Sequence, residues 1–379
     1  MTDRDPARYA IVGGGRRSTF FLRLMRDMPE RYQVTAVHAR SAETRAAVSS
    51  AWGVRTVATV DELLGEHPPE FVIVAVPWPA APELTSRIAG LGVPVLEETP
   101  PAPDLQAMRY LWAEVGASNL VQVADQSKYM PSHAARAEII KRGLIGRPTS
   151  VHVSSNHLYH AVSIMRFLLG VGCDETRVSA HDFVSPIVDP HDFDGWTGDS
   201  STVDKPTTIA TLDFGAARMG LYDFTENQWF NPLRQRRLLV RGTHGEMVDD
   251  RVIRLQDPRT PVLSQIVRRQ TGIDLNLEGF DLDNISFDGA AVYRNEYQGA
   301  RLSDEDIAAA ALVEQMAGWV RGEATAPYPL AEGLQDHLLG LAIEESARTG
   351  ATVTVLREPW AESGSGHGLP PIITNGRAP

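Results

Sequence analysis

The sequence lacks several features that would place it in a specialised class of protein. Its single cysteine, Cys173, cannot form an internal disulfide, so nothing here requires an oxidising compartment. No apolar run approaches the roughly 18 residues that a membrane-spanning helix needs. Basic residues are the minority, 36 against 48 acidic ones, which leaves a net charge of −12. This charge argues against a nucleic-acid partner, because phosphate binding needs a positive surface.

What the sequence does contain is typical of a globular protein. Hydrophobic residues make up 43% of the 379 residues and charged ones 22%, and the length is sufficient for two domains. Residues 1–8 alternate in charge and lack the apolar core of a secretion signal. We therefore expect a cytoplasmic protein that acts on a small-molecule substrate, with no nucleic-acid and no membrane partner.

The first third of the chain alternates short runs rich in Val and Ile with amphipathic stretches. The strongest run, 71–76, is apolar throughout, as in a strand covered on both faces. Further strands are expected at 9–12, 34–37, 93–96 and 120–123, and helices near 20–25, 42–50, 80–89 and 104–114. This alternation predicts parallel βαβ units in a right-handed doubly wound sheet, an α/β fold of the Rossmann type.

The turn after the first predicted strand reads GGGRRS. The dinucleotide fingerprint G-x-G-x-x-G needs a tight turn, then a bare backbone beside the pyrophosphate, then close helix–strand packing. Gly13 and Gly15 fill the first two places, and Ser18, which is still small, fills the third. The next helix would point its N-terminal amides at the phosphates, and Arg16 or Arg17 would add positive charge. The alternative is a glycine turn that binds no ligand.

The end of the second predicted strand bears on which dinucleotide would bind. An NAD site presents Asp or Glu about 20 residues after the turn, where it accepts from the ribose 2′-hydroxyl. This sequence has Arg40 and Ser41 there, a guanidinium fork and a hydroxyl that suit a 2′-phosphate. We therefore predict NADP(H) as the preferred cofactor, with NAD(H) as the second choice. The alternative is that Arg40 is a solvated side chain.

A series of motifs resembles, in the same order, those of the Gfo/Idh/MocA family of oxidoreductases. They are VPW at 76–78 (Thr-Pro-Asn in the family), GVPVLEETP at 92–100 (Gly-x-x-Val-x-x-Glu-Lys-Pro), QSKYMP at 126–131 (Asn-x-Arg-Phe/Tyr-x-Pro), KRGLIG at 141–146 (a helix end), HLYH at 157–160 with MRFLLG at 165–170 (the catalytic-histidine helix) and RGTHGE at 241–246 (Gly-Thr-x-Gly). The resemblance runs from the glycine turn to about Trp360.

The resemblance implies a two-domain protein. An N-terminal Rossmann domain would be joined to a C-terminal α/β domain whose open antiparallel sheet holds a homo-oligomer, a dimer or tetramer. We place the domains at 1–126 and 127–360, followed by a mobile tail at 361–379. By the same resemblance, further cofactor contacts come from Pro77, Trp78, Glu98 and Gln126.

Departures from the family's pattern concern the chemistry. Thr99 stands where the family's Glu-Lys-Pro has its lysine, and Asn156 stands where an aspartate precedes the catalytic histidine. A neutral threonine cannot donate a charge-assisted hydrogen bond, and asparagine cannot act as a general base. The approach to the histidine helix is also shorter than in the family. A simple transfer of the sugar-alcohol dehydrogenase mechanism is therefore in question.

Candidate catalytic groups remain in two places. His160 matches the family histidine in position and is our principal acid/base, because an imidazole has its pKa near neutral pH. The other candidates are His157 as an orienting group, Tyr129 as a proton donor, Lys128 as a cation in place of the missing lysine, and Tyr159 and Trp229 as substrate-binding residues. For each the alternative is a packed or capping residue. No acid or cysteine lies near the histidines, so we predict no metal site.

The second half of the chain has the pattern of an antiparallel sheet. Strands are expected at 150–155, 207–213, 218–224, 237–241, 246–249 and 252–255, and amphipathic helices at 308–320 and 331–348. We expect a long polar loop at 189–205 and an irregular acidic segment at 274–294 that covers a cleft or a neighbouring subunit. Asp336 and His337 are expected to be structural, because adjacent helical residues point apart.

Together these patterns predict an NADP(H)-preferring oxidoreductase that acts on a sugar, a cyclitol or an imine. The substrate would lie between the nicotinamide and the C-terminal sheet. Imine reduction is included because imine reductases with an altered Glu-Lys-Pro look similar. The rival prediction is a non-catalytic sensor or scaffold on a former dehydrogenase fold, which Thr99 and Asn156 favour and which His160 and the glycine turn oppose.

Overall fold

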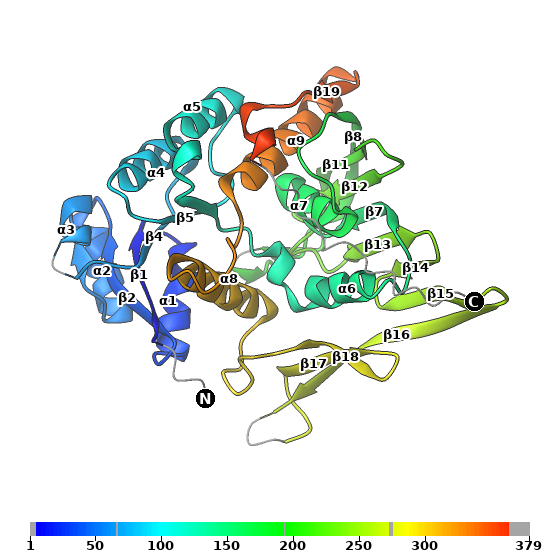
Figure 1. Ribbon diagram of the computed structural model, residues 1–379, viewed down its shortest axis with the longest axis horizontal. Coiled ribbons are helices and arrows are strands. Elements are labelled where there is room, and N and C mark those ends of the chain that lie inside the picture. The colour runs from blue at the N-terminus through cyan, green and yellow to red at the C-terminus, as the bar shows by residue number, and fades with distance from the viewer. Residues whose placement is uncertain (1–4, 66, 193, 273–275, 364–379) are drawn as a thin grey trace. The chain divides into compact units, whose positions relative to one another are not determined.

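The computed structural model describes residues 5–65, 67–192, 194–272 and 276–363 (Figure 1). The chain divides into two compact units, which are treated separately below. The first unit comprises residues 1–131, 270–283 and 295–334, and the second comprises 132–269, 284–294 and 335–379. The predicted domain boundary at 126/127 stays a prediction. Most of the predicted tail, from residue 364 onward, lies outside the described residues.

The first unit contains a parallel sheet with the order β3-β2-β1-β4-β5-β6. Its strands are β1 (Ala7–Val12), β2 (Tyr32–His38), β3 (Thr56–Val57), β4 (Phe71–Val74), β5 (Val95–Glu97) and β6 (Val121–Val123). All neighbouring pairs run parallel. The order reverses between β1 and β4, which is the switch point at which doubly wound folds bind ligands. The predicted Rossmann sheet is confirmed.

Helices follow the strands as the sequence pattern predicts. They are α1 (Ser18–Asp27), α2 (Ala42–Trp52), α3 (Val60–Leu64), α4 (Ala81–Gly90) and α5 (Leu105–Val115). Ser41, Thr59 and Asp104 cap α2, α3 and α5, because each side chain accepts a backbone N–H of the first turn. The short elements β3 and α3 were not predicted, since so few residues show no clear period.

A helix from the C-terminal half of the sequence completes the first unit. Helix α8 (Asp304–Val320) runs beside α1 in Figure 1 and begins at a Ser303 cap. Arg23 of α1 forms an ion pair of 2.6 Å with Asp306, and the Tyr32 hydroxyl lies 3.0 Å from Glu314. These contacts fix α8 to the Rossmann sheet, although nearly 300 residues of sequence separate Arg23 from Asp306.

A second, mostly antiparallel sheet has the order β18-β17-β16-β15-β14-β13-β7-β12-β11-β8-β19 in the described chain. Its strands are β7 (Pro148–Ser154), β8 (Thr176–Val188), β11 (Thr202–Asp213), β12 (Met219–Thr225), β13 (Arg237–Gly242), β14 (Gly245–Val248), β15 (Arg251–Asp257), β16 (Thr260–Thr271), β17 (Asp281–Phe287), β18 (Ala290–Arg294) and β19 (Val353–Val355). Among the described strand pairs of this second sheet, only β7 and β12 run parallel. The predicted open antiparallel sheet is confirmed.

Three further helices occur in the second half of the fold. They are α6 (Pro131–Lys141), α7 (Leu158–Leu169) and α9 (Leu330–Thr349). Helix α9 ends before Gly350, whose φ of 69° is left-handed, as the glycine stop signal predicts. No helix in the described chain is both long and apolar enough to cross a bilayer.

Two predictions about irregular segments are wrong. The expected loop at 189–205 contains a small hairpin, β9 (His191–Asp192) with β10 (Gly195–Trp196), and β11 already begins at Thr202. The expected irregular segment at 274–294 contains the strand pair β17–β18. The outer parts of β8 and β11 are exposed at most positions, so no apolar face gives them the alternation that identifies a strand.

The two faces of the second sheet have different environments. On β12, a Cβ added at Gly220 would lie 2.8 Å from the Met165 Sδ of α7, so this face is covered by the helix. Met219 points to the opposite face and is 37% exposed. The strand register places Ile253 and Leu263, which are also exposed, on the same face as Met219. The histidines of α7 therefore belong to the covered face.

Candidate functional site

The glycine turn of the first unit has a backbone that only glycine can adopt at its first position. Gly13 has a φ of 122°, and a Cβ there would lie 2.1 Å from the carbonyl oxygen of Ala75. At Gly15, by contrast, an added Cβ would meet no protein atom within 4 Å. Protein packing therefore requires glycine at position 13, whereas the space beside position 15 is open to a ligand. This is the division of roles that the dinucleotide fingerprint assigns.

Ser18 occupies the third place of the fingerprint and closes the turn. It is fully buried, and its hydroxyl donates 2.8 Å to the carbonyl oxygen of Gly13. Helix α1 begins there without a side-chain cap and without an acidic residue in its first turn. The positive end of the helix is therefore not neutralised locally, which suits a phosphate.

At the end of β2 the structure separates the two predicted phosphate ligands. Arg40 is exposed, and it has no carboxylate partner among the described residues. The Ser41 hydroxyl instead caps α2, accepting from the Thr44 N–H at 3.0 Å and donating to the Thr44 hydroxyl at 2.7 Å. Arg45, which the sequence analysis missed, donates to the carbonyl oxygens of Ala39 and Arg40 at 2.8 and 2.7 Å. Its sequence signal is a second arginine in the first turn of the helix after β2.

The side chain that faces the glycine turn from β2 is small and apolar. A Cβ built on Gly14 would lie 3.5 Å from the Cβ of Ala39 and 2.5 Å from the Thr44 methyl group. A carboxylate that accepts from a ribose 2′-hydroxyl needs this kind of position, next to the turn. Ala39 has no acceptor to offer there.

The carboxyl ends of β5 and β6 are connected to the glycine turn by one guanidinium group. Arg17 donates through Nε to Glu98 Oε1 at 2.5 Å and through its Nη2 to Gln126 Oε1 at 2.8 Å. Thr99, at the position of the family's lysine, donates its backbone N–H to Glu98 Oε2 at 3.2 Å. Three predicted cofactor residues, Arg17, Glu98 and Gln126, thus lie together. Arg17 immediately precedes α1, but its guanidinium group binds Glu98 and Gln126.

The remaining predicted cofactor residues follow β4 or lie in the turn. Pro77 precedes a short 3-10 helix (Trp78–Ala80), and the Trp78 side chain is 49% exposed. An exposed indole at the carboxyl end of a central parallel strand provides a flat apolar surface beside the switch point. Arg16 is exposed in the glycine turn.

Lys128 and Tyr129 lie in a 3-10 helix (Ser127–Tyr129) that follows β6. The Lys128 ammonium lies 5.1 Å from the centre of the Tyr129 ring and 5.4 Å from that of Tyr328. Burial lowers the pKa of Lys128 to about 8, although Asp125 and Glu332 act in the opposite direction. The Tyr129 hydroxyl donates to the Pro327 carbonyl oxygen at 3.1 Å, and burial raises its pKa. Lys128 therefore suits proton exchange better than Tyr129 does.

In the second unit, the predicted histidines lie in an aromatic cluster at the start of α7. His157 is the residue before the helix, and its ring lies 5.3 Å from that of His160 and 4.9 Å from that of Trp229. Trp229 in turn stacks on Phe224 of β12 at 5.1 Å. The structure thus brings together His157, His160 and Trp229, as well as Tyr159, whose ring lies 4.4 Å from His160.

The electrostatics of this cluster favour a neutral imidazole at His157. Burial, and secondly the neighbouring His160, lower the pKa of His157 to about 4. His157 is therefore neutral at pH 7 and can donate one hydrogen bond and accept another. Asn156 accepts a hydrogen bond of 2.7 Å from the Ser155 hydroxyl, so the position of the family's aspartate carries no charge.

Next to the histidines of α7 lies a layer formed by Asp336 and His337 of α9, which the sequence predicts to be structural. The His337 ring packs edge-on against Tyr159 at 5.7 Å. Asp336 accepts from the Arg166 guanidinium at 2.5 Å, and both side chains are almost fully buried. Adjacent residues of α9 thus contact two different residues of α7. The sequence analysis also did not include Phe224 in the site. Its signal in the sequence is an apolar residue at an alternate position of β12, shortly before Trp229.

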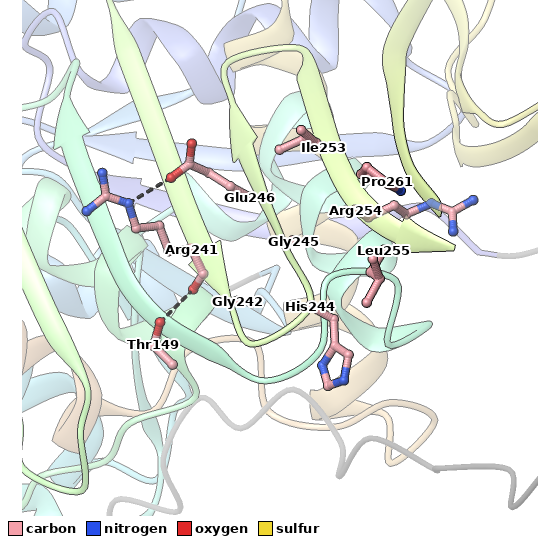
Figure 2. Close-up of a pocket in the computed structure, with 10 residues that line it drawn as sticks. All are labelled: Thr149, Arg241, Gly242, His244, Gly245, Glu246, Ile253, Arg254, Leu255 and Pro261. Atoms are coloured by element: carbon pink, nitrogen blue, oxygen red, sulfur yellow. Dashed lines mark hydrogen bonds and ion pairs between the residues drawn. The ribbon is translucent and has the colours of Figure 1, made fainter. Parts of the chain in front are cut away.

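A separate hollow of about 490 Å³ lies on the exposed face of the second sheet. Figure 2 shows Arg241 and Glu246 joined by an ion pair, which is 2.7 Å long. Ile253 and His244 also line the hollow. None of the predicted catalytic, cofactor or substrate residues lines this hollow. In the described part of the chain, no group of three or more His, Cys, Asp or Glu side chains gathers as a metal site would require.

Comparisons with known proteins identify the first unit's sheet. The family model GFO_IDH_MocA, described as "Oxidoreductase family, NAD-binding Rossmann fold", matches residues 7–124. A search of curated proteins gives no match.

Solved structures extend the likeness to most of the chain. A myo-inositol dehydrogenase from Corynebacterium glutamicum is 18% identical, with 92% of this chain and 99% of that chain covered and a TM-score of 0.63. An oxidoreductase from Agrobacterium radiobacter, in complex with NAD+, L-tartaric acid and magnesium, is 15% identical, with 92% and 98% covered and a TM-score of 0.65. A levoglucosan dehydrogenase, in complex with NADH and levoglucosan, is 17% identical, with 92% and 99% covered and a TM-score of 0.65. At these identities the likeness shows a shared fold.

Proposed function

Because this chain belongs to the Gfo/Idh/MocA family of oxidoreductases through its NAD-binding Rossmann fold at residues 7–124, we propose that it transfers a hydride between a nicotinamide dinucleotide and a small sugar or cyclitol. The observation that carries the proposal is the glycine turn. Gly13 must be glycine for the backbone to pass Ala75, and the space beside Gly15 is open. The α1 N-terminus and Ser18 complete a site that fits a pyrophosphate.

The chemistry then needs one group that moves a proton. When bound, the nicotinamide ring supplies or accepts the hydride. His160 takes the proton of the substrate hydroxyl during oxidation and returns it during reduction. His157 stays neutral, because burial lowers its pKa to about 4, and therefore adds no positive charge that would oppose a charged His160. Lys128 stabilises the substrate oxygen as a cation, in the role that Thr99 cannot fill.

The substrate class follows from the groups around the histidines. Trp229 and Phe224 stack with an angle of 22° between their rings and form an apolar wall beside His157. The apolar C–H face of a sugar or cyclitol packs on such a wall, while the neutral imidazole of His157 exchanges hydrogen bonds with its hydroxyls. Tyr159 of α7 packs edge-on against His157, with their ring centres 5.2 Å apart. An imine is the second substrate class to test, because it needs the same single proton.

We test the catalytic role with His160→Ala, and with His181→Ala as a control on an exposed strand position. A panel of sugars, cyclitols and imines is assayed with both dinucleotides. The expected result is a loss of about 10² to 10⁴-fold in kcat/KM for His160→Ala, with unchanged NADPH affinity. Lys128→Met should remove an inflection near pH 8 from the pH–rate profile. Cofactor binding without turnover of any substrate by the wild type would support the rival sensor function, which Thr99 and Asn156 favour.

We propose further that NADP(H) is the preferred cofactor. Arg40 is exposed without a carboxylate partner among the described residues, and Arg45 is held beside it by two backbone carbonyl oxygens. Ala39 offers no acceptor to a ribose 2′-hydroxyl, so the position favours added negative charge over a free hydroxyl. NAD(H) is the alternative, since the Agrobacterium and levoglucosan enzymes were solved with NAD+ and NADH.

Calorimetry with NADPH and NADH tests this preference. Arg40→Ala and Arg45→Ala should each weaken NADPH binding about tenfold and leave NADH binding unchanged. Arg87→Ala, which removes an exposed arginine paired with Asp61, is the control. A wild type that binds NADH more tightly, with Arg40→Ala indifferent, would refute the preference.

A homo-oligomer formed through the second sheet is also part of the proposal. Met219, Ile253 and Leu263 are exposed on one face of that sheet, and apolar side chains gathered on one exposed face are typical of an interaction surface. A second copy of the chain would cover them. Ile253→Asp should lower the mass measured by light scattering, whereas Leu91→Asp, at an exposed leucine directly after α4, should not. A wild-type monomer would contradict this. The cytoplasmic location stays a prediction from the single cysteine.

A further inference from the structure

The most specific feature of the first unit is the position of Arg17 between the ends of two strands. We infer that Arg17 is a positioning residue which fixes the donors and acceptors at the nicotinamide end of the cofactor site, with Glu98 as acceptor and Gln126 as donor. This inference rests on the proposed dinucleotide site and deepens it. It assigns Arg17 to the nicotinamide end and not to the phosphates.

The geometry joins three elements that are far apart in sequence. Arg17 precedes α1, Glu98 follows β5, and Gln126 follows β6. The guanidinium reaches Glu98 at 2.5 Å and Gln126 at 2.8 Å, and it lies 4.7 Å from the centre of the Phe20 ring. The Glu98 side chain is 11% exposed and that of Arg17 30%, so this contact is partly shielded from water. A pair of this kind, held by a planar donor group, has a defined orientation.

A guanidinium group donates and never accepts, and this decides what its neighbours present. Both oxygens of Glu98 are held as acceptors, with Oε1 on Arg17 and Oε2 on the Thr99 N–H. A carboxylate has about four lone-pair sites, of which these contacts use two. The remaining sites can accept hydroxyl groups. Glu98 is therefore an oriented acceptor.

Gln126 is fixed in the opposite sense. Its Oε1 accepts from Arg17, so its amide nitrogen Nε2 points away from the guanidinium. Nε2 has no hydrogen-bond partner among the described residues. The side chain as a whole is half-buried, which leaves this donor accessible to a ligand. Without Arg17, either end of the amide could face the ligand, because the two ends are alike in shape.

The sheet topology says which part of the dinucleotide meets these groups. The order β3-β2-β1-β4-β5-β6 splits at β1/β4 into two mononucleotide-binding halves. Arg40 and Ala39 lie on the β2 half, where the adenosine ribose is expected, and Glu98 and Gln126 lie on the β5–β6 half. Glu98 thus accepts the hydroxyls of the nicotinamide ribose, and Gln126 Nε2 donates to the carboxamide oxygen.

Three ligands that differ by one part each separate these roles in a calorimetric titration. They are NADPH, the 2′-phosphate of ADP-ribose, which lacks the nicotinamide, and the 2′-phosphate of ADP, which lacks the second ribose as well but keeps both bridging phosphates. Gln126→Glu keeps the shape and an acceptor for Arg17 but removes the donor. It should weaken NADPH binding about tenfold and leave the other two ligands unchanged.

Arg17→Met should weaken the binding of both NADPH and the ADP-ribose compound about tenfold and leave the binding of the ADP compound unchanged, and Arg17→Lys should restore part of the loss. Thermal unfolding and circular dichroism check that each variant is folded. Equal NADPH binding by Gln126→Glu and wild type would overturn the inference, as would an equal loss of all three ligands in Arg17→Met, which indicates a phosphate or folding role.

The outcomes also distinguish this inference from the proposed function. A wild type that binds none of the three ligands overturns the dinucleotide site itself, and the inference with it. A wild type that binds all three, with the two variants unaffected, overturns only the role of Arg17. If NAD(H) is preferred, then NADH, ADP-ribose and ADP serve in the same way.

Discussion

The first and second units hold their candidate functional groups by different physical means. In the first unit, Arg17 and Glu98 are joined by opposite charges, and the glycine turn is set by backbone geometry. In the second unit, His157 and Trp229 are joined by ring packing, and burial discourages charge on the imidazole. A charged cofactor requires fixed charges and a bare backbone. Proton transfer requires a group whose neutral form is stable near neutral pH.

The largest expected effect comes from a substitution that the backbone of the glycine turn cannot accept. Gly13→Ala places a methyl group 2.1 Å from the Ala75 oxygen at a φ of 122°, so it should destabilise the fold by about 4 kcal/mol or more and abolish dinucleotide binding. Gly15→Ala is the matched control, because its methyl group meets no protein atom. It should unfold like the wild type in chemical denaturation yet bind dinucleotide weakly. Full NADPH affinity in Gly15→Ala would contradict a ligand beside this residue.

The second prediction compares an ion pair from each unit. Asp336→Asn leaves Arg166 buried without its carboxylate and should lower the free energy of unfolding by about 3 kcal/mol. Asp306→Asn breaks the partly exposed pair with Arg23 in the first unit and should cost about 1 kcal/mol or less. Urea denaturation of both variants gives the difference. Equal losses would mean that the buried pair does not stabilise the layer behind Tyr159.

The third prediction concerns a buried acid in the first unit. Burial raises the pKa of Glu97, the last residue of β5, well above its ordinary value of 4.5. The unfolded chain releases this proton above pH 4.5 while the folded one retains it, so stability falls as the pH rises, by up to about 1.4 kcal/mol per pH unit. The free energy of unfolding of Glu97→Gln should therefore exceed that of the wild type at pH 7, and the difference should be smaller at pH 5. A constant gap would show that Glu97 is ionised in the fold.

The smallest effect has the opposite sign and lies in the second unit. Burial lowers the pKa of His157 from 6.5 to about 4, so between these values the unfolded chain binds more protons than the folded one. Stability from this residue is present above pH 6.5 and is lost as the pH falls toward 4. Between pH 6.5 and 5 the loss should be about 1.5 kcal/mol. Thermal melting curves of His157→Gln at the two pH values should not show this loss of stability, whereas those of His181→Ala should show it.

Local sequence was sufficient where a structural rule acts over a few residues. The strand, glycine turn and helix at 9–27 follow from apolar period and glycine placement, and Ser18 closes the turn as a small residue must. Local sequence did not predict the hairpin within 189–205, because exposed strands show no apolar alternation. The contacts of His337 could not be inferred either, since they depend on how α9 packs against α7.

The sequence by itself determined the parallel sheet, the turn that suits a pyrophosphate and the presence of histidines at a helix start, because each depends on neighbours within a few residues. Only the tertiary structure decided that Arg17 contacts Glu98 and Gln126, that Ser41 is engaged as a cap while Arg45 lies beside Arg40, and that an aromatic wall surrounds His157. Hydrogen bonds and ring contacts between residues up to about a hundred positions apart depend on the path of the folded backbone, which no local pattern encodes.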